Sequence, residues 1–259
     1  LQRQSLFTEQ DLNNPKVLVA KSHLEKINSN TKIKSYFKDI NHKNIEEYIK
    51  SSLVLDCTDN MQTRFLLNEF CFKNDISWIY SAIIESTGML FNIVPKKTPC
   101  LTCIFNEIDQ PLDSCDVSGV INTIASMASS LQVTEALKWI TGKATTKELL
   151  YFDVWKNKIQ KIKVKKQEGC PTCNSKFPHL SGKNVNNVIE LCGTNSYQLY
   201  GPKLNIKEVA KRLERIDKVT INEYCLLFRE LTVFNDGRTL IKAPTPQRAR
   251  AIYTKYIGY

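Results

Sequence analysis

The sequence predicts an α/β fold, with a Rossmann-like, mostly parallel sheet, a structural zinc staple and a small C-terminal α+β domain. Helix and strand patterns alternate from residue 14 to residue 95, which is typical of crossover units joined into a parallel sheet. Beyond residue 183 the pattern changes to short strands, with a hairpin signal at Asp236-Gly237. We therefore expect one domain at residues 1–178 and a second at residues 183–259.

The elements of the first domain follow from the spacing of apolar residues. Such residues recur every three or four positions from Val17 to Ile27, which predicts a helix over residues 14–27. Ile33 alternates with lysines, which predicts a strand over residues 31–40. Leu53-Val54-Leu55 is a short apolar run, as in a buried parallel strand. The other expected elements are helices at 44–51, 61–74 and 121–139, strands at 77–84 and 88–95, and a hairpin of 149–154 with 158–164.

The long helix over residues 121–139 is expected to turn one apolar side toward the sheet. That side carries Ile121, Ile124, Ala128, Leu131 and Leu137. In the second domain the same reasoning predicts helices at 206–216 and 247–256. The strands expected there lie at 188–191, 197–199, 224–228, 231–234 and 239–242.

Composition limits the class of protein. The chain has 259 residues, of which 42% are hydrophobic and 24% charged, as in an ordinary globular protein. The formal charge is +10, but only 8 of the 36 basic residues are arginines, on which nucleic-acid readers depend. We therefore expect no nucleic-acid partner. No run of about 18 apolar residues occurs, so we expect no membrane span.

Two CxxC pairs predict a structural metal site. Cys100 and Cys103 form one pair, and Cys170 and Cys173 form the other. Two such pairs complete a closed tetrahedral thiolate site, which suits Zn2+. A redox pair and an iron–sulfur cluster are the alternatives. Nine cysteines without an export signal also indicate a reducing compartment, so we expect a cytoplasmic protein.

Three residues are candidates for phosphate chemistry. Asp59 follows the buried strand 53–55, and ligands of open α/β sheets bind beyond the carboxyl ends of strands. The alternative is that Asp59 caps the next helix. Arg3 and Lys16 could supply the fixed positive charge that phosphoryl chemistry needs. The alternative for each of these cations is a solvated surface charge.

Six separated motifs together resemble the ThiF/MoeB/HesA family, the prokaryotic relatives of ubiquitin-activating enzymes. The match runs in order from Leu1 to about Cys173. The motifs are LQRQ at 1–4, NPKV at 14–17, LDCTDN at 55–60 with Arg64 and Asn68, PC-x-x-C at 99–103, Cys115 before Gly119-Val120, and GCPTC at 169–173.

The resemblance implies an ATP-dependent adenylyltransferase. The family activates the C-terminal glycine carboxylate of a ThiS- or MoaD-type ubiquitin-like sulfur carrier, giving an acyl-adenylate and pyrophosphate. Matched to this chain, Arg3 and Lys16 would contact the phosphates and Asp59 would bind Mg2+. Gln4 and Asn60 would line the nucleotide pocket. The resemblance also implies a homodimer and a sulfurtransferase partner.

Cys115 is the remaining candidate catalytic residue. Some members of the family use a cysteine here for a thioester or acyl-disulfide step, which an exposed thiol can perform, and others do not require it. Asp113 and Asp116 flank Cys115, and their charges would raise its pKa rather than activate it. Both interpretations of Cys115 stay open at this point.

The chain departs from the family at its start. It begins at Leu1 and has no glycine before Gly88, whereas the family has a glycine-rich loop and an acidic ribose ligand upstream of LQRQ. We therefore expect an N-terminally truncated chain that alone binds ATP weakly or not at all. The alternative function is a non-catalytic, zinc-stapled scaffold that docks a ubiquitin-fold partner. A dinucleotide-binding Rossmann protein is disfavoured, because no G-x-G-x-x-G fingerprint is visible.

Overall fold

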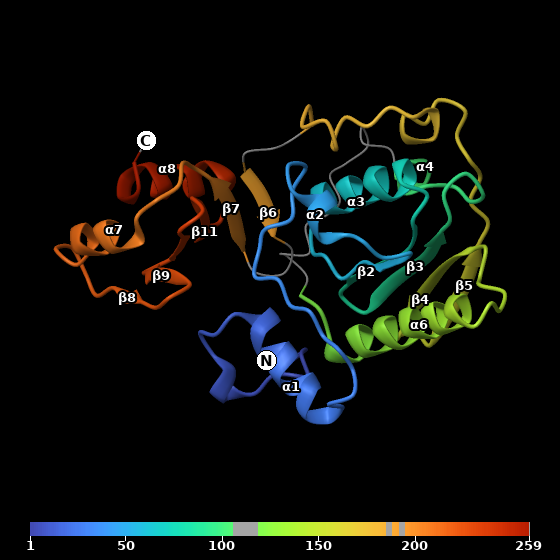
Figure 1. Ribbon diagram of the computed structural model, residues 1–259, viewed down its shortest axis with the longest axis horizontal. Helices are drawn as coiled ribbons and strands as arrows, with labels where there is room; N and C mark the ends of the chain where they lie inside the picture. The colour runs from blue at the N-terminus through green and yellow to red at the C-terminus, as the bar shows by residue number, and fades with distance from the viewer. Residues whose placement is uncertain (106–118, 185–187, 192–194, 259) are drawn as a thin grey trace.

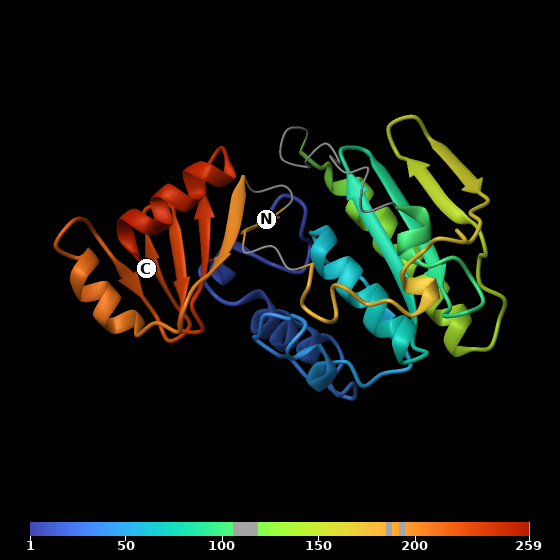
Figure 2. The ribbon, with the colours of Figure 1, turned by 90° about the horizontal axis from the view of Figure 1, so that it is seen from above.

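The chain forms two β-sheets, each with helices and buried residues of its own (Figure 1). The computed structural model describes residues 1–105, 119–184, 188–191 and 195–258. Figure 2 shows the two sheets side by side along the long axis of the molecule. One cluster of buried residues lies under the C-terminal sheet, and two clusters lie on the first sheet. No helix of the described residues is long and apolar enough to cross a bilayer.

The first sheet has five strands in the order β1-β2-β3-β4-β5. The strands are β1 (Leu53–Leu55), β2 (Ser77–Ile84), β3 (Thr87–Ile93), β4 (Leu149–Asp153) and β5 (Lys158–Ile162). The α/β class is confirmed, but the sheet is mixed rather than mostly parallel: β1 pairs with β2 in parallel, and the three other pairs are antiparallel. For two of these pairs the reason is a short connection, because two residues join β2 to β3 and four join β4 to β5, and so tight a hairpin forces antiparallel pairing.

Helices cover both faces of this sheet (Figure 1). Side chains alternate along β2, so Trp78 and Tyr80 pack in the cluster of α3 (Met61–Lys73), and Ile79 packs in the cluster of α6 (Asn122–Ile140). The expected helices and strands from residue 44 to residue 162 are all present, with ends within a few residues of those predicted. The shorter elements of this part are η1 (Glu9–Asp11), α1 (Lys16–Ile27), α2 (Ile45–Tyr48), α4 (Leu101–Ile104) and η2 (Thr172–Asn174).

The strand expected over residues 31–40 is wrong. Within this segment no residue is in a strand. Its alternating side chains face the C-terminal sheet instead: the ring of Phe37 packs against those of Tyr224 and Phe234, at centroid distances of 5.4 and 6.1 Å. The carboxylate of Asp39 accepts a hydrogen bond from the Tyr200 hydroxyl at 3.0 Å. The alternation that predicted a strand therefore reflects tertiary contacts with the C-terminal sheet.

The C-terminal sheet is antiparallel, in the order β6-β7-β11-β10-β9-β8. Its apolar face packs against both helices of this part in a single buried cluster. The predicted elements are present with small shifts of their ends. They are β6 (Val188–Leu191), β7 (Ser196–Tyr200), α7 (Ile206–Leu213), β9 (Cys225–Phe228), β10 (Leu231–Phe234), β11 (Arg238–Lys242) and α8 (Pro246–Tyr256). The short strand β8 (Thr220–Ile221) was not predicted.

Helix α6 carries buried polar residues on the side that faces the sheet. Gln132 and Glu135 are 4% and 3% exposed. Leu137, expected on the buried side, is 56% exposed. The Glu135 carboxylate accepts hydrogen bonds from the Asn92 amide at 2.7 Å and from the Thr146 N–H at 2.8 Å. Glu135 thus ties α6 to β3 and to the segment that leads into β4.

Replacing Glu135 with glutamine should lower the free energy of unfolding at pH 7 by about 1–2 kcal/mol, because the hydrogen bonds lose their charge. Burial alone would raise the pKa of Glu135, but hydrogen bonds from Lys138, Thr146 and Asn92 outweigh it and lower the pKa. The contribution of the charge is therefore present above the ordinary pKa of about 4.3 and is lost as the pH falls through the folded value.

Urea unfolding of the wild type and the variant at pH 7 and at about pH 3, below the lowered pKa of Glu135, measures this difference. Glu25→Gln is the matched control, because Glu25 forms an exposed pair with Lys21 at 3.6 Å that contributes little. A Glu135→Gln effect of the same size at both pH values would contradict the explanation.

Candidate active site and metal centre

The four cysteines of the two CxxC pairs meet at one point. The Sγ atoms of Cys100 and Cys103 are 3.9 Å apart, and Sγ–Sγ distances between the pairs are 3.4 to 3.6 Å. All four lie within 4.8 Å of one another. A tetrahedral zinc with Zn–S bonds of about 2.3 Å needs Sγ atoms about 3.8 Å apart. The donor set and its spacing therefore fit a tetrathiolate zinc ion, and no position is left open for a substrate.

Asn68 joins the two CxxC pairs to helix α3. The Asn68 side chain is fully buried. Its Oδ1 accepts a hydrogen bond from the Leu101 N–H at 2.9 Å, and its Nδ2 donates to the hydroxyls of Thr102 and Thr172 at 3.1 and 3.3 Å. No structural role was predicted for Asn68 from the sequence. The available signal was a carboxamide directly after the apolar residues Phe65, Leu66 and Leu67, because a polar group buried among apolar ones needs partners.

The turn after β1 leads directly into α3. Asn60 is the N-cap of this helix, and its Oδ1 accepts a hydrogen bond from the Thr63 N–H at 2.8 Å. The alternative that Asp59 caps the helix is therefore wrong. The Asp59 carboxylate accepts a hydrogen bond from the Asn60 amide at 3.3 Å. Because Asn60 is the cap, the Asp59 carboxylate is not needed for the helix. Asp59 lies in the turn between β1 and α3.

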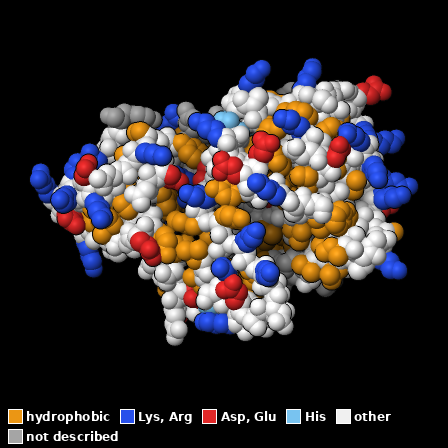
Figure 3. Space-filling view, in the orientation of Figure 1, with side chains coloured by type: hydrophobic (Ala, Val, Ile, Leu, Met, Phe, Trp, Pro, Cys, Tyr) orange, Lys and Arg blue, Asp and Glu red, His pale blue; other side chains and the backbone are white. Residues whose placement is uncertain are grey.

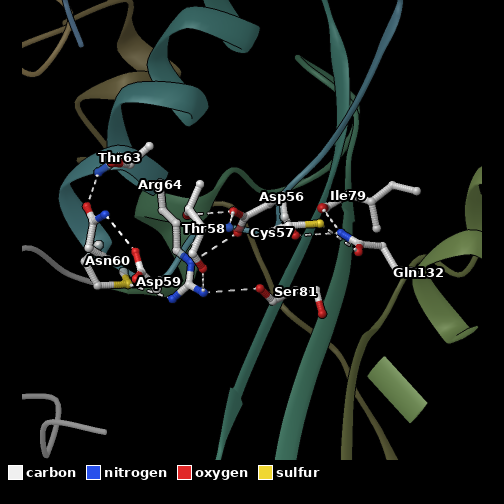
Figure 4. Close-up of polar contacts among 11 residues, drawn as sticks. Asp56, Cys57, Thr58, Asp59, Asn60, Thr63, Arg64, Ile79, Ser81 and Gln132 are labelled. Carbon is white, nitrogen blue, oxygen red and sulfur yellow. Dashed lines mark hydrogen bonds and ion pairs between the residues drawn. The ribbon is translucent and has the colours of Figure 1, made fainter. Parts of the chain in front are cut away.

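A buried ion pair shapes this turn (Figure 4). Asp56 and Arg64 are 1% and 8% exposed, and the Arg64 Nε donates to the Asp56 carboxylate at 3.1 Å. The Arg64 Nη2 donates to the carbonyls of Thr58 at 2.7 Å and Ser81 at 3.3 Å. The other Asp56 oxygen accepts from the N–H and hydroxyl of Thr58. Burial raises the pKa of Asp56, and the Arg64 charge opposes that rise.

Gln132 connects the turn to the opposite face of the sheet. Its Nε2 donates to the carbonyls of Asp56 at 2.8 Å and Ile79 at 3.0 Å (Figure 4). Asp56 follows the end of β1, and Ile79 lies in β2 opposite Leu55, so these bonds fix α6 to both strands beside the turn. Sequence reasoning missed Gln132, although it lies four positions after Ala128 on the apolar stripe, where a polar residue is a signal.

One cavity gathers four of the predicted site residues. It has a volume of about 520 Å³, within the range of small-molecule sites. Arg3, Gln4, Lys16 and Asp59 all line it, together with the turn residues and Gln132. A second cavity of about 380 Å³ also contains Arg3, Gln4 and Lys16. Two cations and a carboxylate around one cavity can hold a triphosphate and its metal ion.

Three further residues of the predicted motifs differ from the four that line the cavity as predicted. Asn60 does not line the 520 Å³ cavity, and its side chain is engaged as the cap. Cys57, which follows Asp56 in the turn after β1, is exposed and lines the cavity. Cys115 lies outside the described residues. The roles of Arg3, Gln4, Lys16, Asp59 and Asn60 stay predictions.

The ThiF family profile matches residues 1–172. The sulfur carrier protein ThiS adenylyltransferase of Bacillus subtilis is 34% identical over 273 residues, which cover 100% of this chain and 81% of that protein. The protein of the same name from Escherichia coli is 28% identical. That match covers 67% of this chain and 70% of the Escherichia coli protein. Protein HesA of Leptolyngbya boryana is 31% identical, and the match covers 69% of this chain and 65% of that protein. The chain belongs to the ThiF family.

Solved structures share the fold of the first part. The crystal structure of Escherichia coli MccB with ATP matches with a TM-score of 0.56 and 19% identity, over 67% of this chain and 55% of that chain. Another crystal structure of Escherichia coli MccB matches with a TM-score of 0.58 and 18% identity. This match covers 66% of this chain and 53% of that chain. This chain thus spans about half the length of the solved chains. Such low identity shows the fold and no more.

Proposed function

We propose that the protein is an adenylyltransferase that activates the C-terminal glycine carboxylate of a ubiquitin-like sulfur carrier of the ThiS or MoaD type, for sulfur transfer in cofactor biosynthesis. Its membership of the ThiF family supports this, as do the names of its relatives in Bacillus subtilis and Escherichia coli. The observation that carries the proposal is the single cavity that holds Arg3, Lys16 and Asp59.

In the proposed reaction a carboxylate oxygen of the carrier attacks the α-phosphorus of ATP. A C(O)O–P bond forms, the bond between the α-phosphorus and the bridging oxygen breaks, and pyrophosphate leaves with the electron pair. Because the attacking carboxylate is a weak nucleophile, the triphosphate charge must be neutralised. Arg3 and Lys16 would contact the phosphates, and Asp59 would hold the Mg2+ that supplies further positive charge. Gln4 and Asn60 are proposed to contact the nucleotide.

We assign Zn2+ to the four cysteines Cys100, Cys103, Cys170 and Cys173. The ion would staple segments that lie 66 residues apart in the chain. A closed set of four thiolates makes this role structural. Cys115 is proposed as the nucleophile of a later covalent step, and adenylylation does not need it.

We extend the proposal to the domain division, the partners and the location of the protein. The division into domains at 1–178 and 183–259 is supported by the separate buried cluster under the C-terminal sheet. A homodimer, a sulfurtransferase partner and a cytoplasmic location complete the proposal. Figure 3 shows lysines and arginines spread over this face, interspersed with acidic residues and gathered beside β5.

The test is ATP–pyrophosphate exchange by the protein expressed from its complete reading frame, with a carrier whose chain ends in Gly-Gly. Asp59→Asn should slow exchange by about a hundredfold, since a carboxylate that holds the metal loses its charge. Asp75→Asn is the matched control, because Asp75 is exposed and pairs only with Lys96 among the described residues. Exchange that is absent with every carrier, despite tight carrier binding, would favour the scaffold alternative instead.

A further inference from the structure

A cavity separate from the candidate active site lies where the C-terminal sheet meets the first part of the chain. Its volume is about 350 Å³, and it shares no lining residue with the cavity of Arg3 and Lys16. Its wall comes from residues 40–43, from the first turns of α3, and from β6, β7 and the β10–β11 turn. Small-molecule sites occur preferentially at such junctions between domains.

The basic side chains on this wall are available to a ligand. Over the described part of the chain, neither the His42 imidazole nor the Lys43 ammonium has a hydrogen-bond or ion-pair partner. The acidic residue of the wall, Asp236, already faces Arg238, whose N–H donates to it at 3.0 Å and whose Nε lies 4.0 Å away. Among the described residues, the Lys43 ammonium is therefore the positive charge of this wall that no acid pairs.

Helix α3 adds to this positive potential. Gln62 and Thr63, from its first turn, line the cavity. The Thr63 N–H already donates to the Asn60 side chain, so the helix contributes the partial positive charge of its start, which favours phosphate groups. A lysine that faces the same space as a helix start is a common arrangement in phosphate sites. The described histidines and acids of this wall do not converge as metal ligands, because the cysteine cluster is the one such group found among the described residues.

The rest of the wall is suited to the organic moiety of a phosphorylated molecule rather than to a phosphate ion alone. Ile40, Leu66 and Ile189 supply apolar surface, and Asn41 supplies a carboxamide for hydroxyl groups. The volume of about 350 Å³ far exceeds that of one phosphate ion. We propose that this cavity binds a small phosphorylated organic molecule of the size of a pentose phosphate, with Lys43, His42 and the start of α3 around the phosphate.

The cavity lies next to the turn that carries Asp59, at the start of α3. Asp59 immediately precedes the cap of α3 and lines the other cavity, so the two cavities lie on different sides of one helix start. Tyr200, Gly201 and Asp236 lie beyond residue 172, where the family match ends. The site therefore needs the C-terminal part of the chain.

Isothermal titration with D-ribose 5-phosphate tests this proposal. The protein carries Arg3→Gln and Lys16→Gln, so that the first cavity offers no phosphate contact. We expect one bound molecule, an increase in Kd of at least about tenfold on adding Lys43→Gln, and a smaller increase with His42→Asn. Lys50→Gln is the matched control, because Lys50 is exposed on the same segment and lines none of the cavities described above; its Kd should stay within about twofold.

The other outcomes overturn the proposal. No binding, or a Kd that Lys43→Gln leaves unchanged, would mean that this cavity is not a phosphate site. Binding to the wild type that is lost in Arg3→Gln and Lys16→Gln would place the phosphate in the first cavity. If inorganic phosphate binds as tightly as ribose 5-phosphate, the wall does not recognise the sugar, and the proposal of an organic ligand is wrong. Because none of these readouts uses turnover, they are independent of the adenylylation test.

Discussion

Replacing Cys100 with serine is expected to abolish zinc binding and to lower the free energy of unfolding by at least about 3 kcal/mol. Cys100 is fully buried and its Sγ lies 3.4 Å from that of Cys170. A hydroxyl is a poor replacement for a thiolate at zinc, so the ion no longer holds α4 to η2. Metal analysis of the purified protein and chemical unfolding in the presence of excess zinc measure the two effects.

Cys225→Ser is the matched control for this variant. Cys225 is buried in β9 and lies outside the metal cluster. The control should keep its zinc and show only the cost of burying a hydroxyl, about 1–3 kcal/mol. A Cys100→Ser protein that retained one tightly bound zinc would show that the four thiolates are not the ligand set.

Replacing Arg64 with methionine should lower the free energy of unfolding by about 3–5 kcal/mol, because it leaves the Asp56 carboxylate buried without a counter-charge. Burial already raises the pKa of Asp56, and removing the guanidinium raises it further. An acid whose folded pKa lies above its unfolded value makes the protein less stable as the pH rises. The variant should therefore lose more stability at pH 8 than at pH 5, as measured by urea unfolding.

The double variant Asp56→Asn/Arg64→Met separates charge from packing. It removes both charges and should recover part of the loss, whereas Arg64→Met alone leaves one charge buried. Arg250→Met on the exposed side of α8 is the control for loss of an arginine, and it should change stability by no more than about 0.5 kcal/mol. A loss that is equal at both pH values would contradict the role given to Asp56.

The helices and most strands could be predicted because apolar spacing follows the period of each element. The spacing of Val17 to Ile27 predicted α1, and the run Leu53–Leu55 predicted β1. Strand direction was harder, because the same apolar run fits a parallel or an antiparallel neighbour. Residues 31–40 show the same limit, since alternation records which side of a segment is covered and not whether a strand or a ring covers it.

The candidate site was predictable to the extent that its residues lie in motifs. The four cysteines could be paired from their spacing, and they converge as expected. Arg3, Lys16 and Asp59 were candidates through the resemblance, and they line one cavity. The supporting contacts could not be foreseen, because Gln132 reaches the Asp56 carbonyl across 76 positions of sequence, and no local pattern records such a distance.

The contacts of residues 31–40 with the C-terminal sheet also impose an order on folding during synthesis. Asp39 reaches the Tyr200 hydroxyl across 161 positions, so it leaves the ribosome long before its partner exists. Until β10 has formed, the ring of Phe37 has no cover from Phe234. Closing so long a loop is slow. Docking of this segment is therefore expected to be the last step of folding, and a nascent chain stalled before residue 224 would expose it to chaperones and proteases.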